Sequence, residues 1–300
     1  MSTRAYGMDH DRYDWSLLAQ RPPLQWPGEC TLALWVCVAA PAYPLNPQKG
    51  LVAVPGNMTM PYPDLRHFTL RDYGNRVGIY RVLDALDAAG VQPSFAVNGV
   101  VPERYPRLFH TLCQRGNEIL AHSWQMDCAH ATGVDPELEA RWVESTLSTL
   151  RQASGQVVRG WLSPGKIQSE NTPELLAKNG VQYQADWVND DLPYAFRTQQ
   201  GELTALPLTT ELEDRFLIDE NKHSAAEWAQ QVMDAADALH AESQHSGGRM
   251  LSLHLHPWVI GQPHRIAALE QALAHITALP GVWSARPSDI VSAFRSQPSP

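Results

Sequence analysis

The sequence lacks most features that mark secreted, membrane-spanning or thiolate-rich proteins. Its four cysteines among 300 residues are scattered, with no Cys-x-x-Cys pair. A disulfide framework or a thiolate zinc site therefore has little support. No apolar run approaches the roughly 20 residues that cross a bilayer, and the first residues, MSTRAYGMDHDRYDW, carry charges throughout, unlike a secretory signal. We therefore expect a cytoplasmic protein with free thiols.

The sequence is also poor in clustered positive charge. Lys and Arg number 23 against 32 Asp and Glu, which gives a net charge of −9. Without a basic cluster, neither nucleic acid nor an anionic membrane is an expected partner. No Gly-x-Gly-x-x-Gly follows an early strand, so the main signal for dinucleotide binding is missing. The hydrophobic fraction of 44% nevertheless suffices for a large core.

Short apolar segments alternate with amphipathic helical segments along most of the chain. We predict strands at residues 31–38, 93–97, 118–121, 157–162, 181–186, 203–208, 250–255 and 282–285. We predict helices at residues 77–90, 102–115, 136–153, 172–180, 224–241, 266–278 and 288–294. This alternation favours an α/β fold of parallel βα units that form a closed or nearly closed barrel. A doubly wound open sheet is the alternative.

The predicted elements form one domain. We assign residues 30–296 to a single barrel and residues 1–29 to an N-terminal extension that packs on it. Residues 39–74, rich in Pro, Gly and Tyr, form a long loop after the first strand. A loop of this length in a compact domain is usually functional, so we expect it to form a wall or lid of a site.

Polar and aromatic side chains follow several predicted strands directly. Because active sites of such sheets lie at the carboxyl ends of the strands, we expect these groups to converge. Imidazoles can accept a proton from water near neutral pH, carboxylates can orient them, and indoles can wall a flat ring. This set favours hydrolysis. Its members are Asn98, His122, Trp124, Asp127, Trp161, Ser163, Asp186, Asn189, Asp190, Asp191, His254 and His256.

Several longer segments resemble the polysaccharide deacetylase superfamily, and more specifically its allantoinase-like and cyclic-imide-hydrolase-like subgroup. The likeness runs from about residue 30 to 290. It implies a distorted (β/α)7-type barrel, an acid/base role for His256, and homo-oligomers. The segments are RDYGNRVG (71–78), AHSW (121–124), GWLSPG (160–165), DWVNDDLPY (186–194) and LHPWVIGQPHR (255–265).

The resemblance also shows what this chain lacks. Metal-dependent members hold a divalent ion with an Asp after the first strand and a His-x-x-x-His pair later. Here the first strand leads into residues 39–42, Ala-Ala-Pro-Ala, which contain no acid. At the two positions of the His-x-x-x-His pair, this chain has His122 and Met126. A thioether is a poor ligand for a hard cation, so we expect no metal and no other cofactor. Relatives often carry an acid where Ala39–Ala42 stands, and the arginine of their third motif is Trp161 here.

We therefore predict a metal-independent amidohydrolase that opens a small cyclic amide, namely an imide, a hydantoin or a ureide such as allantoin. The alternatives are a metal-dependent deacetylase of an N-acetyl sugar and a degenerate member that only binds a small ligand or a protein. His254 is expected to pack structurally, while Asp186 and Asp190 compete for one contact with the site. The predicted catalytic residues are His122, His256, Asp127 and Asp190. The predicted substrate-binding residues are Asn98, Trp124, Trp161, Ser163, Asp186 and Trp258.

Overall fold

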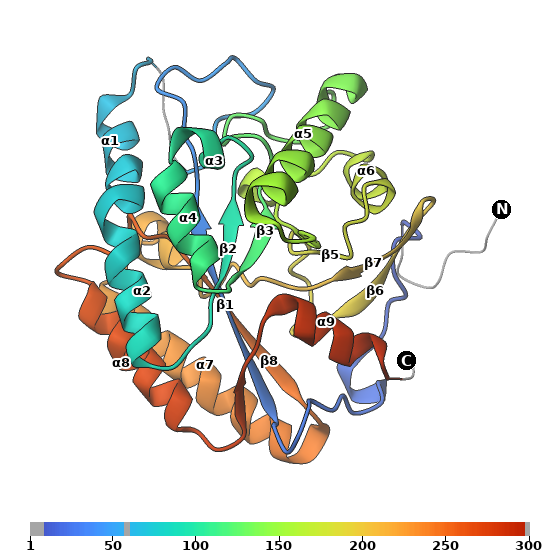
Figure 1. Cartoon of the computed structure of the whole chain (residues 1–300). Coiled ribbons are helices and arrows are strands. Elements are labelled where there is room, and N and C mark those ends of the chain that lie inside the picture. Colours follow the sequence, from blue (N-terminus) through green and yellow to red (C-terminus); the bar gives the residue numbers. More distant parts are fainter. Residues whose placement is uncertain (1–8, 57–60, 298–300) are drawn as a thin grey trace.

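A curled sheet of mostly parallel strands forms the centre of the protein (Figure 1). The computed structural model describes residues 9–56 and 61–297. Its strands are β1 (Leu32–Ala40), β2 (Ser94–Val97), β3 (Glu118–Ala121), β4 (Gly160–Trp161), β5 (Tyr183–Gln184), β6 (Tyr194–Thr198), β7 (Gly201–Ala205), β8 (Arg249–Leu255) and β9 (Val282–Ser284). Their order is β6-β7-β5-β4-β3-β2-β1-β8, and β9 pairs with the first half of β1. From β7 to β8 this order contains seven parallel strands.

Helices cover the outside of the curl. Those of the described residues are α1 (Leu65–Tyr73), α2 (Ile79–Ala88), α3 (Val101–Arg104), α4 (Pro106–Gln114), α5 (Pro136–Ser154), α6 (Thr172–Lys178), α7 (Ala225–Ser246), α8 (Ile266–Ala278) and α9 (Pro287–Arg295), with π-helical turns η2 (Gly74–Gly78) and η4 (Arg215–Glu220). Helix α8 packs against both α2 and α7 on one flank of the sheet (Figure 1).

Strand β1 is buried on both faces, as expected for the centre of a parallel sheet. Because side chains alternate along a strand, Leu34 and Val36 join the core under the helices, whereas Trp35 and Cys37 face the inside of the curl. The inner core also contains Tyr183 of β5. Inward-facing side chains thus fill the curl below the carboxyl ends of its strands.

Three local features differ from the predicted elements. The predicted helix 102–115 is two helices, because Tyr105 precedes Pro106 and takes non-helical angles of φ −130° and ψ 57°. The predicted loop 39–74 contains helix α1. The predicted strand 203–208 is part of a hairpin, in which β6 pairs antiparallel with β7 and extends the sheet edge. Antiparallel pairing needs only the short turn at residues 199–200, whereas a parallel neighbour needs a long crossover.

The described part of the segment before β1 runs along the barrel surface. Arg12 Nη1 donates to Glu174 Oε1 of α6 at 2.5 Å, and Arg197 of β6 pairs with Asp14 at 2.8 Å. Nearer β1, Trp26 Nε1 donates to the carbonyl of Arg249 in β8 at 2.7 Å. The segment therefore contacts two sides of the barrel.

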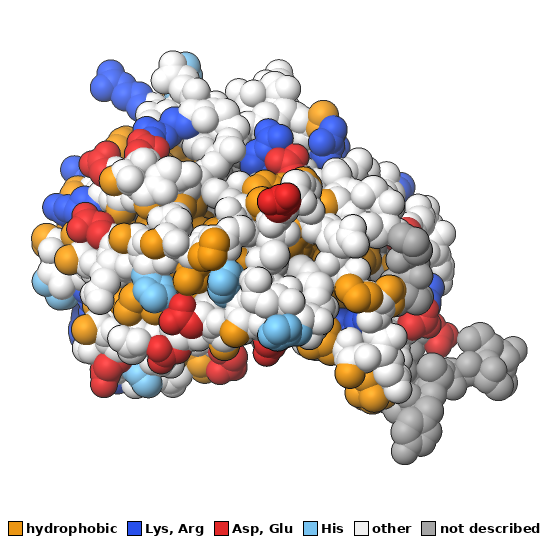
Figure 2. Space-filling view, turned by 90° about the horizontal axis from the view of Figure 1, so that it is seen from below, with side chains coloured by type: hydrophobic (Ala, Val, Ile, Leu, Met, Phe, Trp, Pro, Cys, Tyr) orange, Lys and Arg blue, Asp and Glu red, His pale blue; other side chains and the backbone are white. Residues whose placement is uncertain are grey.

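The surface carries mixed charge. On the face shown in Figure 2, acidic and basic side chains are interspersed, and Lys and Arg form no single large cluster. Among the helices that the structure describes, none has the length and apolar character needed to cross a membrane. All four cysteines are free.

Candidate active site

A small cavity of about 90 Å³ lies where β3 and β8 end. Its walls come from both sides of the curl and from the long loop after β1, which contributes Tyr43, Pro55 and Gly56. Two of its imidazoles belong to residues predicted to be catalytic. The other lining residues are His122, Met126, Leu162, Ser163, Gly165, Lys166, Thr210, Glu213, Arg215, His254 and His256.

His122 follows the last residue of β3 and is fixed by one hydrogen bond. Its Nδ1 lies 2.6 Å from the carbonyl oxygen of Leu162. A carbonyl only accepts, so Nδ1 carries the proton and Nε2 keeps its lone pair. Burial lowers the pKa of His122 to about 3, so the ring is neutral at pH 7 and can accept a proton at Nε2.

His254 and His256 stand on the same face of β8 and its extension, because side chains alternate with period two. Their ring centroids are 4.4 Å apart. The Nδ1 of His256 lies 2.8 Å from Asp214 Oδ1, and the backbone N–H of His256 donates to Asp214 Oδ2 at 2.8 Å. Asp214 thus contacts both the backbone and the ring of His256, and the other ring nitrogen, Nε2, faces Glu213.

Burial also dominates the acid–base behaviour of this pair. It lowers the pKa of His254 and of His256 to about 4 each, with the neighbouring imidazole adding to the effect at His254. It raises the pKa of Asp214 to about 8, against the hydrogen bond from the His256 backbone. Both rings are therefore uncharged at neutral pH.

These shifts predict an acid-sensitive fold. Because each of the three folded-state imidazoles has a pKa below the 6.5 of an unfolded His, the unfolded chain takes up protons first as pH falls. Stability from this source is complete above about pH 6.5 and is lost as pH falls toward 4. Asp214 acts in the opposite sense. Because its pKa is raised, it keeps a proton in the folded state near pH 5, and this proton offsets the uptake by one of the three imidazoles in the unfolded chain. We expect the free energy of unfolding to fall by about 2–3 kcal/mol per pH unit near pH 5.

Urea unfolding at pH 7, 6 and 5 measures this slope. His254→Phe should reduce it by about 1 kcal/mol per pH unit, whereas His110→Gln, at an exposed position on α4, serves as the matched control. An identical slope in the wild type and His254→Phe would contradict the assignment.

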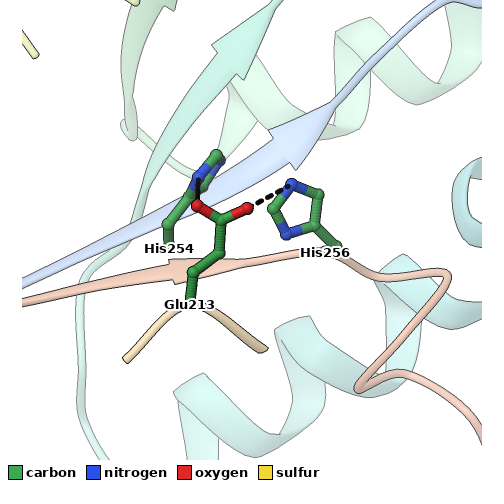
Figure 3. Close-up of side chains that lie close together, drawn as sticks. All are labelled: Glu213, His254 and His256. Carbon is green, nitrogen blue, oxygen red and sulfur yellow. Dashed lines mark ion pairs between the residues drawn. The ribbon is translucent and has the colours of Figure 1, made fainter. Parts of the chain in front are cut away.

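Glu213 lies between the two imidazoles of β8 (Figure 3). Its carboxylate oxygens are 3.5 Å from His254 Nδ1 and 3.7 Å from His256 Nε2. Arg215 Nε donates to Oε1 at 2.9 Å, and Lys166 Nζ lies 3.5 Å from Oε2. Burial raises the pKa of Glu213, but His254, His256 and Lys166 outweigh it and hold the pKa well below its usual value. Glu213 is therefore an ionised carboxylate inside the cavity.

The cluster of Glu213, His254 and His256 has the donor types of a metal site. All its ligand atoms lie within 4.8 Å of one another, and two imidazoles with one carboxylate is a known zinc set. The charge balance opposes an ion, because Arg215 and Lys166 already neutralise Glu213 and would stand beside any added cation. A buried divalent ion therefore does not fit this chain's residues.

Of the three positions at which metal-dependent relatives carry ligands, only His122 keeps one. Residues 39–42 contain only alanine and proline, and Met126 lines the cavity with a thioether. Proton transfer is the chemistry that the cavity's residues support.

Three predicted substrate-binding residues lie at or next to the cavity. Ser163 lines it, and its hydroxyl accepts from Trp161 Nε1 at 2.8 Å. The Ser163 hydroxyl also acts on the Asp186 carboxyl, whose pKa it helps to lower against the larger effect of burial. Asp186 stands behind Ser163 and accepts from its backbone N–H at 2.6 Å. Trp258 packs against His256, with ring centroids 5.9 Å apart.

Other predicted site residues have structural partners instead. Asn98 is buried and joins β1 to the His122 loop by accepting from the N–H of Ala42 at 2.7 Å. Trp161 lies in the core below Ser163, and Trp124 packs on Gly99. The structure does not bring these three side chains into the lining of the cavity.

The two carboxylates predicted to be catalytic point elsewhere. Asp127 Oδ2 accepts from the backbone N–H of Gln48 at 3.0 Å and so fastens the long loop. Asp190 pairs with Arg21 at 2.6 Å, beside the N-terminal segment. Neither belongs to the lining of the cavity. The carboxylates that face its imidazoles are Glu213 and Asp214.

Sequence reasoning missed Glu213, Asp214, Lys166 and Arg215, and it assigned His254 to packing. The two acids lie eight and nine residues beyond the end of β7, just before η4, so a search directly after strands could not find them. The available signal was the acidic run in the segment ELEDRF (211–216), in which charged residues sit between apolar ones.

A buried polar network supports the loop that begins at His122. Glu139 of α5 accepts from Thr172 Oγ1 at 2.6 Å and from Ser169 Oγ at 2.7 Å, and its Oε1 lies 3.1 Å from His130 Nδ1. The other ring nitrogen of His130 lies 2.9 Å from Ser123 Oγ. Ser123 has a φ of 56°, which a non-glycine residue adopts only when its surroundings hold it there.

Comparisons with known proteins agree with this geometry. Residues 70–184 match a family model described as "Polysaccharide deacetylase". A Schizosaccharomyces pombe protein described as "Putative polysaccharide deacetylase" is 25% identical over 261 residues, which cover 79% of this chain and 80% of that protein.

Two solved structures share the fold over nearly the whole chain. A "probable Polysaccharide deacetylase" from Pseudomonas aeruginosa PAO1 superposes with a TM-score of 0.81 at 24% identity, over 92% of this chain and 95% of that one. "Puue Allantoinase" superposes with a TM-score of 0.81 at 23% identity, over 94% of this chain and 98% of that one. The predicted α/β fold with a distorted barrel is confirmed.

Proposed function

The chain belongs to the polysaccharide deacetylase superfamily of hydrolases, and we propose that it opens a small cyclic amide by metal-independent attack of water. One observation carries the proposal. His122 and His256, from separate strands, line one cavity, and each ring is fixed through Nδ1. Two neutral imidazoles in one cavity can move protons to and from a substrate between them.

His256 is the residue best placed to act as the base. In the ionised form of Asp214, which accepts from Nδ1, the Nε2 of His256 takes a proton from water, and the resulting hydroxide adds to the ring carbonyl. Asp214 holds the ring in one orientation, and ionised Glu213, 3.7 Å from Nε2, stabilises the imidazolium that forms. As the C–N bond breaks, the imidazolium returns its proton to the departing ring nitrogen, so the linear product carries one new carboxylate.

Ser163, His122 and Glu213 can supply the other interactions that this reaction needs. The Ser163 hydroxyl, whose oxygen accepts from Trp161, can donate to the oxygen that becomes negative in the tetrahedral intermediate. His122 can hold or relay a proton on the opposite side of the ring. Glu213 also supplies a carboxylate to a cavity whose first strand, unlike that of relatives, ends without one.

An activity panel tests the function. Imides, hydantoins, cyclic ureides and N-acetyl sugars should be assayed with the wild type, with His122→Ala and with His256→Ala. Ring opening lost in both variants would support the proposal. Turnover confined to N-acetyl sugars would favour the deacetylase, and tight binding of a small ligand without turnover would favour a protein that only binds.

Metal removal gives a separate prediction. Because Arg215 and Lys166 neutralise Glu213, we expect chelation with EDTA followed by dialysis to leave kcat/KM for ring opening unchanged, and elemental analysis to find no stoichiometric metal. Stoichiometric zinc that disappears in Glu213→Gln together with activity would contradict the charge argument.

A further inference from the structure

Two buried side chains next to the cavity have donors without acceptors. Arg71 is 2% exposed, and its Nη1 donates to the carbonyl of His67 at 3.0 Å. Its Nε and Nη2 have no hydrogen-bond partner among the described residues, and neither does Nε1 of Trp258, which is also 2% exposed. Buried N–H groups are nearly always paired, so three unpaired N–H groups on two stacked side chains require an explanation.

Two aromatic faces hold the guanidinium, together with the hydrogen bond from Nη1 to His67. Its central carbon lies 4.3 Å from the ring centroid of Trp258 and 5.5 Å from that of Tyr43. Stacking fixes the plane of the guanidinium and leaves its edges open. Nε and Nη2 share one edge, and this is the pair of parallel donors that binds a carboxylate through both oxygens.

This group adjoins the proposed reaction centre. Tyr43 lines the cavity, and the Trp258 ring packs on that of His256. The charge of Arg71 also acts on His256, whose pKa it helps to lower, although burial is the main cause. An anion held by Arg71 would therefore lie beside the imidazole that accepts the proton.

The other two cations near the cavity, Arg215 and Lys166, differ from Arg71 in that their charged groups all have partners, whereas two N–H groups of Arg71 have none among the described residues. Arg215 pairs with Glu213 and Glu220, and Lys166 binds Glu213. Burial lowers the pKa of Arg71 even though Tyr43, Asp219 and Asp64 act to raise it. A buried charge of this kind is costly unless a ligand completes its hydrogen bonds.

We propose that the ring substrate carries a carboxylate, which the Nε and Nη2 edge of Arg71 binds with help from Trp258 Nε1. The proposal rests on the proposed function and narrows it to anionic cyclic amides. Neutral rings would leave the three donors unpaired, and a site built to pair buried polar groups rejects ligands that cannot do so.

Matched ligands test the carboxylate subsite. Dihydroorotate and its primary amide have the same ring and shape but differ in charge, and dihydrouracil lacks the substituent. We expect kcat/KM to be about 10- to 100-fold higher for the carboxylate than for the amide, the effect of hydrogen bonds to a charged group. The carboxylate should also raise the melting temperature more than the amide does.

Two variants test whether Arg71 and Trp258 cause the preference for the carboxylate. Trp258→Phe keeps an aromatic ring beside Arg71 but deletes the N–H together with the five-membered part of the indole. Arg71→Lys keeps the charge but loses the paired edge. Both should reduce the carboxylate-to-amide ratio. Arg249→Lys, a buried arginine bound to Glu242 away from the cavity, should leave the ratio unchanged.

The two proposals fail in different ways. Equal turnover of the carboxylate and the amide, insensitive to both variants, would overturn the subsite and leave the function intact. Absence of turnover with every ring, together with a melting-temperature rise specific to the carboxylate and lost in Arg71→Lys, would overturn the function and support the subsite.

Discussion

Replacing His256 by alanine should lower kcat/KM for ring opening by about 10²- to 10⁴-fold, the range that positioned proton transfer supplies. The reason is specific to this ring. Its Nδ1 is engaged by Asp214 and its Nε2 faces ionised Glu213, so it can take a proton from water and be stabilised once charged. The measurement is steady-state kinetics on the best substrate of the panel, with His110→Ala as a surface control.

Asp214→Asn tests the orientation of the same ring. Asparagine is nearly isosteric, but its NH₂ group can only donate, so it can hold His256 in the tautomer that has its proton on Nε2. We expect a loss of kcat comparable to that in His256→Ala, with little change in KM. If Asp214→Asn retained most of its activity while His256→Ala did not, Asp214 would be structural and the proposed tautomer would be wrong.

The parts of the site that could be predicted from sequence are those set by strand geometry. His122 follows a short apolar strand directly, and the period of two along β8 places His254 and His256 on one face. For these residues a local pattern fixes both the position along the strand and the side on which the ring lies. The parallel order of the sheet then brings the strand ends together.

The remaining site residues depend on partners that are distant in sequence. His122 and His256 directly follow strands, whereas Asp127 and Asp190 lie several residues further along loops, and the loops turn them toward Gln48 and Arg21. Glu213 lies far beyond the end of its strand and enters the cavity because the loop before η4 folds back over the curl. No local pattern encodes which way a loop turns.

The same limit applies to the fold. Long amphipathic helices such as α5 and α8 carry their own periodicity and lie at or within one residue of the predicted ranges. Strands β4 and β5 are two residues each, shorter than the predicted segments. Leu162 and Ser163 follow β4 and line the cavity. Strand pairing is a tertiary property, so the apolar pattern of a segment does not set where its pairing ends.

Breaking the buried network behind His122 should have the largest effect on stability. We expect Glu139→Ala to lower the free energy of unfolding by about 3–5 kcal/mol, the cost of removing one partner from a buried hydrogen-bonded network. The carboxylate is fully buried and accepts from Ser169 and Thr172 beside His130, so its loss leaves several polar groups unpaired at once. Urea unfolding at pH 7 measures the change.

Glu137→Ala on the same helix is the matched control, because that side chain is exposed and should change stability by no more than about 0.5 kcal/mol. The network also holds Ser123 in its left-handed conformation, directly after His122, so Glu139→Ala should reduce kcat in the folded protein while Glu137→Ala does not. If Glu139→Ala were destabilised but kept its kcat, the network would stabilise the fold without positioning His122. Unchanged stability would mean that burying Glu139 costs as much free energy as its hydrogen bonds return. The loop would then be held by its other hydrogen bonds, such as that between His122 and Leu162.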